Sequence, residues 1–94
     1  MAAADETSFT SVVFSGHVQG VGFRYAALQV AREFDLAGYV QNLPNGKVRL
    51  EAEGESAVIE EFLGALQERM RGYIRGVERS NGRRPPQFSG FGVR

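Results

Sequence analysis

Alternating hydrophobic and polar residues near the start of the chain predict a β-strand over residues 9–15. Val12 and Phe14 share one face of this segment, FTSVVFS, which is rich in β-branched and aromatic residues. A cluster of glycines follows in residues 16–22, GHVQGVG, and apolar residues then recur at the spacing of one helix face. The chain therefore starts with a strand, a glycine-rich loop and a helix. The apolar positions of this helix are Phe23, Ala27, Val30, Ala31 and Phe34.

The middle of the chain predicts a β-hairpin. Residues 38–43, GYVQNL, have the composition of a strand, and residues 47–53, KVRLEAE, alternate between apolar and charged positions. Asn45-Gly46 between the two segments is a strong signal for a hairpin turn. The apolar face of the second strand holds Val48, Leu50 and Ala52.

A second helix and two further strands are predicted for the rest of the chain. Ser56 is a suitable N-cap for the helix, and Gly72 ends it. Residues 73–79 alternate weakly and predict a fourth strand, whereas residues 81–87, NGRRPPQ, break regular structure. Residues 88–94 predict a short edge strand that contains two glycines. The apolar stripe of the second helix is Ile59, Phe62, Leu63, Leu66 and Met70.

The predicted order of elements is βαββαβ with a C-terminal addition. Two crossover units of this kind place both helices on one face of an antiparallel sheet, which is the ferredoxin-like α+β fold. With 94 residues the chain has room for a single domain, predicted over residues 9–94, after a disordered leader of residues 1–8.

Composition narrows the classes of function. The chain has no cysteine, which excludes disulfides, thiolate metal sites and cysteine-based phosphatase chemistry and fits a cytoplasmic protein. Eleven basic residues balance eleven acidic ones, so no bulk attraction to nucleic acid or to an anionic membrane is expected. The N-terminal segment lacks the features of a signal peptide, and no apolar run reaches the roughly 18 to 20 residues needed to cross a bilayer. Any binding site for an anion must therefore be formed by a few neighbouring residues and not by the net charge of the chain.

The glycine-rich loop is the strongest candidate for such a site. A turn of this kind between a strand and a helix exposes successive backbone N–H groups and the positive end of the helix. Gly16, Gly20 and Gly22 can adopt backbone angles closed to other residues, and Arg24 places a guanidinium at the helix start. The glycine pattern matches neither the Walker A motif nor the dinucleotide motif. Taken alone, it leaves an ordinary loop with a solvated arginine as an equal alternative.

Two longer segments resemble signatures of the acylphosphatase family. Residues 16–24, GHVQGVGFR, resemble the phosphate-loop signature of this family, and residues 38–54, GYVQNLPNGKVRLEAEG, resemble its second signature. The resemblance implies a metal-free, cofactor-independent enzyme that hydrolyses the carboxyl-phosphate anhydride of small acyl phosphates, expected to act as a monomer. It also implies that Arg24 binds the phosphoryl group and that Asn42 positions the attacking water. The predicted phosphate-binding loop comprises His17, Val18, Gln19, Gly20, Val21, Gly22 and Phe23.

Other polar residues have simpler interpretations. His17 is the only histidine of the chain, and with no carboxylate close in sequence it is predicted to take no part in proton transfer. The sequence does not show whether Gln19 touches substrate or only shapes the turn. Spacing alone makes Asn42 a turn residue, and the family resemblance reverses that interpretation. Arg83 and Arg84 are predicted to lie in a solvated turn.

Two other classes of protein share this order of elements. An RNA-recognition domain would display aromatic residues on its open sheet face, whereas the third predicted strand offers Lys47, Arg49, Glu51 and Glu53 there, and the two glutamates are interpreted as surface carboxylates. Acylphosphatase-like domains also occur within larger hydrogenase-maturation proteins, and a chain of 94 residues favours the free-standing enzyme. The physiological acyl phosphate stays open, because all acyl phosphates present the same phosphoryl end.

Overall fold

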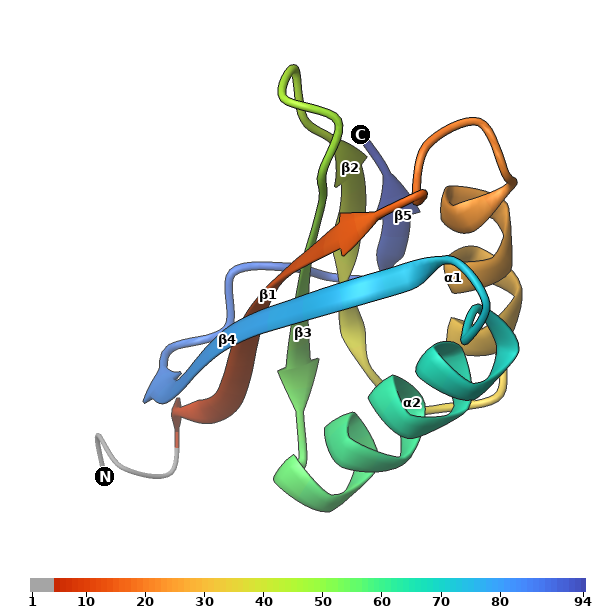
Figure 1. The fold of residues 1–94 in the computed structure, drawn as a ribbon. Helices are drawn as coiled ribbons and strands as arrows, with labels where there is room; N and C mark the ends of the chain where they lie inside the picture. Colours follow the sequence, from red (N-terminus) through yellow and green to blue (C-terminus); the bar gives the residue numbers. More distant parts are fainter. Residues whose placement is uncertain (1–4) are drawn as a thin grey trace.

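The computed structural model describes residues 5–94, in which a five-stranded sheet packs against two helices (Figure 1). Both helices lie on the same face of the sheet, which gives two layers. This arrangement confirms the predicted βαββαβ order and the ferredoxin-like α+β fold, with one strand added at the C-terminal end. The elements are β1 (Thr7–Gly16), α1 (Phe23–Ala31), β2 (Ala37–Asn42), β3 (Val48–Gly54), α2 (Ser56–Arg69), β4 (Ile74–Arg84) and β5 (Phe91–Val93).

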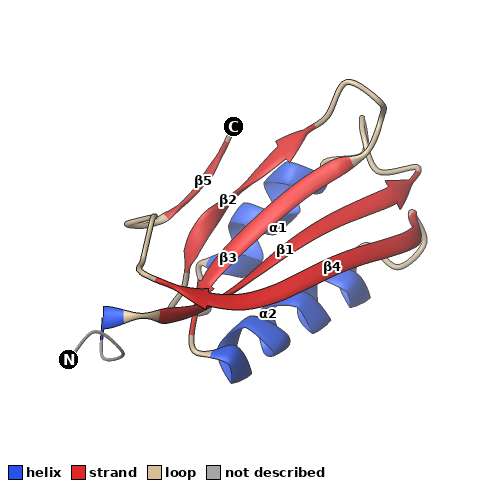
Figure 2. Cartoon of the chain, turned by 90° about the vertical axis from the view of Figure 1, so that its left-hand side faces the viewer, coloured by secondary structure: helices blue, strands red, loops and turns tan. Residues whose placement is uncertain are grey.

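The strands lie in the order β4-β1-β3-β2-β5 (Figure 2). The first four strands pair antiparallel, as predicted. β5 instead pairs parallel to β2, with Phe91 opposite Gly38, so the sheet is mixed at this edge. Val48 at the start of β3 lies opposite both Phe14 near the end of β1 and Asn42 at the end of β2. The loop after β1 and the hairpin after β2 therefore emerge at the same end of the sheet.

The apolar faces predicted from the sequence form the core between the sheet and the helices. Val12 and Phe14 on β1 and Leu50 on β3 are fully buried. Phe34 packs edge-on against Phe62 on α2, with 6.2 Å between ring centroids. Each large apolar side chain buried in this way contributes about 1.5–3 kcal/mol to folding. The buried helix residues are Phe23, Ala26, Ala27, Val30, Ala31, Ile59, Phe62, Leu63 and Leu66.

The predicted N-terminal leader is too long. β1 begins at Thr7, so residues 7 and 8 belong to the strand, where they pair with the far end of β4. Residues 1–4 of the predicted leader lie outside the described residues. The strand reaches back this far because Thr7 is opposite Arg84, a partner more than 70 positions away that local pattern does not reveal.

Three predicted helix boundaries also differ, one of them the end of α2, which lies at Arg69 rather than next to Gly72. α1 ends at Ala31 rather than at Phe34, because the N–H groups of residues 32–34 bond to carbonyls three positions earlier and tighten the chain into a turn. Ser56 is the first residue of α2 and not its N-cap. Glu55 occupies the N-cap position with extended backbone angles and no side-chain cap, and its carbonyl accepts the N–H of Ile59 at 3.0 Å.

The fourth strand is longer than its alternation indicates. β4 runs from Ile74 to Arg84, so the prediction that residues 81–84 break regular structure is wrong. Thr10 Oγ1 on β1 donates to Asn81 Oδ1 at 2.9 Å, and a Cβ at Gly82 would approach the Phe9 ring to 2.7 Å. Asn81 and Gly82 form a turn signal by local sequence, yet β1 holds both in the ladder.

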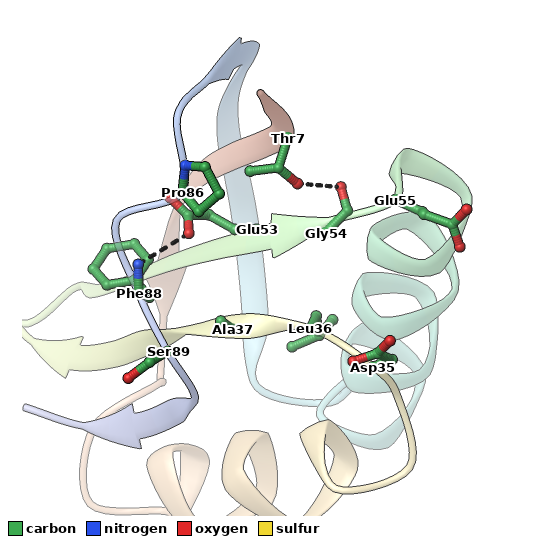
Figure 3. Close-up of a pocket in the computed structure, with 10 residues that line it drawn as sticks. All are labelled: Thr7, Asp35, Leu36, Ala37, Glu53, Gly54, Glu55, Pro86, Phe88 and Ser89. Carbon is green, nitrogen blue, oxygen red and sulfur yellow. Dashed lines mark hydrogen bonds between the residues drawn. The ribbon is translucent and has the colours of Figure 1, made fainter. Parts of the chain in front are cut away.

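Residues 85–90, which we call the strap, connect β4 to β5 across the face of the sheet opposite the helices, here called the open face (Figure 3). Glu53 on β3 accepts the N–H of Gln87 at 2.9 Å and that of Phe88 at 3.1 Å. The prediction of Glu53 as a surface carboxylate is wrong, since its exposed fraction is 3%. The predicted strand over residues 88–94 shortens to β5 because its first three residues belong to the strap.

Arg84 ends β4 as the partner of this buried carboxylate, and the prediction of a solvated turn is wrong for it. Its Nε donates to Glu53 Oε2 at 3.2 Å, and its Nη2 donates to Glu51 Oε1 at 3.3 Å. Arg83 is more exposed, and its Nη1 donates to Ser8 Oγ at 3.2 Å. Thus only one arginine of the pair faces solvent.

The sequence predicted an open face without aromatic residues from the third strand alone. The structure places aromatic residues of the neighbouring strands on that face. Phe9 on β1 and Tyr39 on β2 share the face of the glutamates opposite them on β3. The Arg84 guanidinium carbon lies 4.0 Å from the Phe9 ring centroid, and that of Arg94 lies 4.1 Å from the Tyr39 ring centroid. These rings are engaged in cation–π contacts and do not form the bare platform that base stacking uses.

Candidate active site

The glycine-rich loop of residues 17–22 joins the end of β1 to the start of α1, at the end of the sheet where β2 also ends (Figure 1). Gly20 and Gly22 adopt left-handed backbone angles, with φ of 78° and 79°. A Cβ at either position would meet no atom within 4 Å, so glycine is favoured by backbone conformation and not by space. The loop shape therefore depends on these two residues.

Gly22 is the N-cap of α1 and supplies no capping side chain. The first helical bond runs from Ala26 N–H to Gly22 carbonyl at 2.9 Å, so the N–H groups of residues 23–25 precede the helical ladder. α1 has no acidic residue in its first turn. The partial positive charge of this helix end is therefore not offset from within the helix.

A cavity of about 210 Å³ opens between the loop, the first turn of α1 and the end of β2. It brings together Arg24 and Asn42, which the sequence places 18 positions apart. Among the described residues that line it, Arg24 is the one with a formal charge, so the cavity favours anions. The lining residues are Val18, Gly20, Gly22, Phe23, Arg24, Tyr25 and Asn42.

Arg24 and Asn42 enter the cavity from different elements. Arg24 lies in the first turn of α1, and its Nη1 donates to the main-chain oxygen of Arg94 at 3.4 Å. Asn42 is the last residue of β2, half-buried and opposite Val48. A residue with a guanidinium and a residue with a neutral amide thus line the same cavity, and the strand of the latter is fixed by pairing with β3.

Gln19 ties the loop to the hairpin that follows Asn42. Its Nε2 donates to the carbonyl of Leu43 at 2.8 Å and to that of Lys47 at 2.9 Å. The hairpin is closed by a bond from Leu43 N–H to the Lys47 carbonyl at 2.8 Å. Gln19 uses both N–H groups of its amide in this contact, so it joins the two segments that line the cavity.

Three residues of the predicted loop do not line the cavity: His17, Gln19 and Val21. The His17 ring stacks on Tyr73, with 6.4 Å between ring centroids, and its backbone N–H donates to the Tyr73 carbonyl at 2.9 Å. Val21 packs against the hydrophobic core. These contacts stabilise the loop from outside the cavity.

The similarity to known proteins decides the family. A family model described as acylphosphatase matches residues 10–93. The chain belongs to the acylphosphatase family. An acylphosphatase from Archaeoglobus fulgidus is 47% identical over 68 residues, which cover 71% of this chain and 76% of the relative.

Solved acylphosphatase structures agree with the fold. The crystal structure of the Bacillus subtilis acylphosphatase has a TM-score of 0.82 and 26% identity, and it covers 92% of this chain and 97% of its own. An acylphosphatase structure from Coxiella burnetii has a TM-score of 0.77 and 32% identity, with 100% of this chain and 98% of its own covered. An acylphosphatase is therefore the enzyme class that these relatives support.

A larger hollow of about 420 Å³ lies at the opposite end of the sheet, beside the strap (Figure 3). Its carboxylates include Asp35, Glu53 and Glu55, and Glu53 is already bound to Arg84 and the strap. A hollow edged by carboxylates repels phosphate, so the smaller, electropositive cavity is the better acylphosphatase site. The lining residues are Thr7, Asp35, Leu36, Ala37, Glu53, Gly54, Glu55, Pro86, Phe88 and Ser89.

Other features of this acylphosphatase-family chain lie away from the cavity. Within residues 5–94, no three side chains of His, Cys, Asp or Glu gather where they could hold a metal ion. Nor does any helix in that part of the chain have the length and apolar character of a membrane span. The Arg79 guanidinium on β4 is hydrogen-bonded to Glu60 on α2 and holds the pKa of that carboxyl below its usual range.

Sequence reasoning assigned no role to Tyr25, which lines the cavity next to Arg24. Its exposed fraction is 61%, high for a large side chain with an apolar ring. The available signal was its position in the first turn of the helix after the acylphosphatase loop signature. The hydrogen bonds from Gln19 to the hairpin could not be predicted from the sequence, because the two carbonyls that accept them lie on another element.

Proposed function

We propose that this chain hydrolyses acyl phosphates to a carboxylate and inorganic phosphate, with the phosphoryl group bound by the loop amides and Arg24. The attacking water is positioned by Asn42. The observation that carries the proposal is that Arg24, Asn42 and the N-terminal end of α1 line one cavity. The family relationship supports the reaction, and the cavity suggests which residues perform it.

The phosphoryl group fits the electropositive side of the cavity. N–H groups at the start of a helix are donors for an anion of phosphate size, and the helix dipole adds to their effect. Arg24 supplies a planar guanidinium that can donate to two phosphoryl oxygens at once. These donors stabilise the negative charge on the equatorial oxygens as phosphoryl transfer proceeds.

Asn42 suits a water-positioning role because its amide carries both a donor and an acceptor but no charge. A neutral amide is too weak a base to remove a proton fully, yet it can orient a water molecule in line with the leaving group. Its place at the end of β2, fixed by pairing with β3, gives that water a defined direction. Gln19 supports this geometry by tying the loop to the hairpin after Asn42.

The leaving group explains why so few residues suffice. An acyl phosphate expels a carboxylate, which is stable at neutral pH and needs no strong general acid. Charge stabilisation and positioning can therefore carry the reaction. We extend the proposal to a metal-independent monomer formed by one domain that begins with β1 at Thr7. We place it in the cytoplasm, in keeping with the absence of cysteine from the sequence.

Metal independence and substrate class give the first prediction. Hydrolysis of benzoyl phosphate is expected to persist after exhaustive chelation, because Arg24 and the loop amides supply the positive charge. p-Nitrophenyl phosphate is expected to react far more slowly, since a phenolate is more basic than a carboxylate and is therefore a poorer leaving group. Both rates are measured with chelator-treated protein. Activity lost on chelation and restored by Mg²⁺ would contradict the metal-free mechanism.

Replacement of Asn42 by alanine separates water positioning from phosphate binding. We expect kcat for benzoyl phosphate to fall roughly 10²-fold, while competitive inhibition by inorganic phosphate changes by no more than about twofold. His17→Ala is the control, because its ring stacks on Tyr73 outside the cavity lining, and it is expected to stay close to wild type. Equal losses of turnover and of phosphate inhibition in Asn42→Ala would place Asn42 in the phosphate cradle instead.

A further inference from the structure

Tyr25 is an exposed aromatic residue that is nevertheless held in place. Gln29 Nε2, one turn further along α1, donates to the Tyr25 hydroxyl at 2.8 Å. Gln29 Oε1 in turn accepts from Arg69 Nη2 on α2 at 2.6 Å. A chain of two hydrogen bonds thus links the tyrosine to the neighbouring helix. Its exposed fraction of 61% is greater than that of Tyr73, Val77 or Val93, the other exposed large hydrophobic residues in the described part of the chain.

This anchoring restricts a ring that solvent would otherwise leave free to rotate. A bond at the hydroxyl fixes the far end of the side chain, while the backbone of α1 fixes the near end. Ordering a side chain in advance of binding removes part of the entropy cost of forming a complex. The ring of Tyr25 therefore offers a prepared apolar surface beside the cavity.

The cavity itself is small for a ligand site. Its volume of about 210 Å³ lies below the range of about 300–1,000 Å³ for typical ligand pockets. With the phosphoryl group at the loop and Arg24, a large acyl group would lie toward the rim, where Tyr25 is exposed. Val18 and Phe23 also line the cavity but are buried in the core. Among the described lining residues, Tyr25 is the one that offers exposed apolar surface at this rim.

We propose that Tyr25 is a specificity-determining residue whose ring packs against the acyl group and favours aromatic acyl phosphates over acetyl phosphate. This inference rests on the proposed function, because it takes Arg24 and the loop as the phosphoryl site. An aromatic acyl group gains an offset or edge-on ring contact with Tyr25, whereas an acetyl group is too short to cover the ring. The Gln29 and Arg69 bonds hold the ring ready for this contact.

Tyr25→Ala tests the proposal through a ratio of substrates. We expect kcat/KM for benzoyl phosphate to fall roughly 3- to 10-fold, mainly through KM, while that for acetyl phosphate changes by less than about twofold. Tyr25→Phe keeps the ring and loses the bond to Gln29, so it should retain most of the preference. Val77→Ala removes exposed apolar surface from β4, outside the cavity lining, and should leave both substrates unchanged.

Inhibition gives a second readout that needs no turnover of the probe. Phenylphosphonate combines a phosphoryl-like end with an aromatic ring, so Tyr25→Ala should weaken its inhibition while inhibition by inorganic phosphate persists. Equal losses for benzoyl and acetyl phosphate, or an unchanged ratio, would overturn the specificity role. Failure of the proposed function itself would look different, because the wild-type protein would then hydrolyse neither substrate.

Discussion

Arg24→Ala is expected to lower kcat/KM for benzoyl phosphate by at least roughly 10²- to 10³-fold, the loss typical of one oxyanion donor. Arg24 is the one charged residue among the described residues that line the cavity. Its removal therefore leaves only N–H dipoles to face the phosphoryl group. The value of kcat should fall, KM should rise, and competitive inhibition by phosphate should weaken. This pattern distinguishes Arg24 from Asn42, whose loss should spare phosphate inhibition.

Arg24→Lys is expected to rescue little of this activity. Lysine keeps the positive charge but not the planar fork that can bridge two phosphoryl oxygens. Arg71→Ala is the matched control, since it removes a side chain that is 77% exposed and, within residues 5–94, forms an ion pair with Glu68 alone, three residues earlier. A folded Arg24→Ala protein, checked by circular dichroism, that keeps near-normal kcat/KM would refute the site assignment.

Glu53→Ala is expected to destabilise the fold by about 3 kcal/mol, the lower end of the range for a broken buried ion pair. The lower end applies because the Arg84 side chain is 20% exposed and water can solvate it in part. The substitution leaves Arg84 and the N–H groups of Gln87 and Phe88 without their carboxylate. Urea denaturation followed by circular dichroism measures the change in the free energy of unfolding.

Two further variants show whether this loss comes from the strap. Glu53→Gln keeps an acceptor for the strap N–H groups but loses the charge facing Arg84, so we expect a smaller loss than for alanine. Glu68→Ala removes an exposed carboxylate, 69% exposed, and should change stability by less than about 1 kcal/mol. A Glu53→Ala protein as stable as Glu68→Ala would show that the strap does not depend on Glu53.

The sequence predicted those parts of the fold whose signals are local. Val12, Phe14 and the stripe on α2 repeat with the periods of a strand and a helix, and all of them are buried in the core. Apart from the helix boundaries, the errors involve partners far away in the chain. Alternation correctly puts Glu53 on the face opposite the helices, but the strap that buries it comes from residues more than 30 positions later.

The candidate site was predictable to a similar extent. The glycine pattern and Arg24 point to an anion site by local chemistry, whereas Asn42 became a candidate through the family resemblance, since spacing alone made it a turn residue. The contribution of Gln19 depends on two carbonyls of the hairpin, and that of Tyr25 depends on Gln29 and a residue of α2. Such contacts can be identified only from the positions of the side chains in the structure.

The most direct test of the proposed reaction is to follow benzoyl phosphate hydrolysis by the purified wild-type protein in water enriched in heavy oxygen. Water held by Asn42 should attack phosphorus, so we expect one inorganic phosphate per benzoate, with the heavy oxygen in the phosphate. Mass spectrometry of both products locates the label. Hydrolysis no faster than in buffer alone, or label found in benzoate instead, would contradict phosphoryl transfer to water at this site.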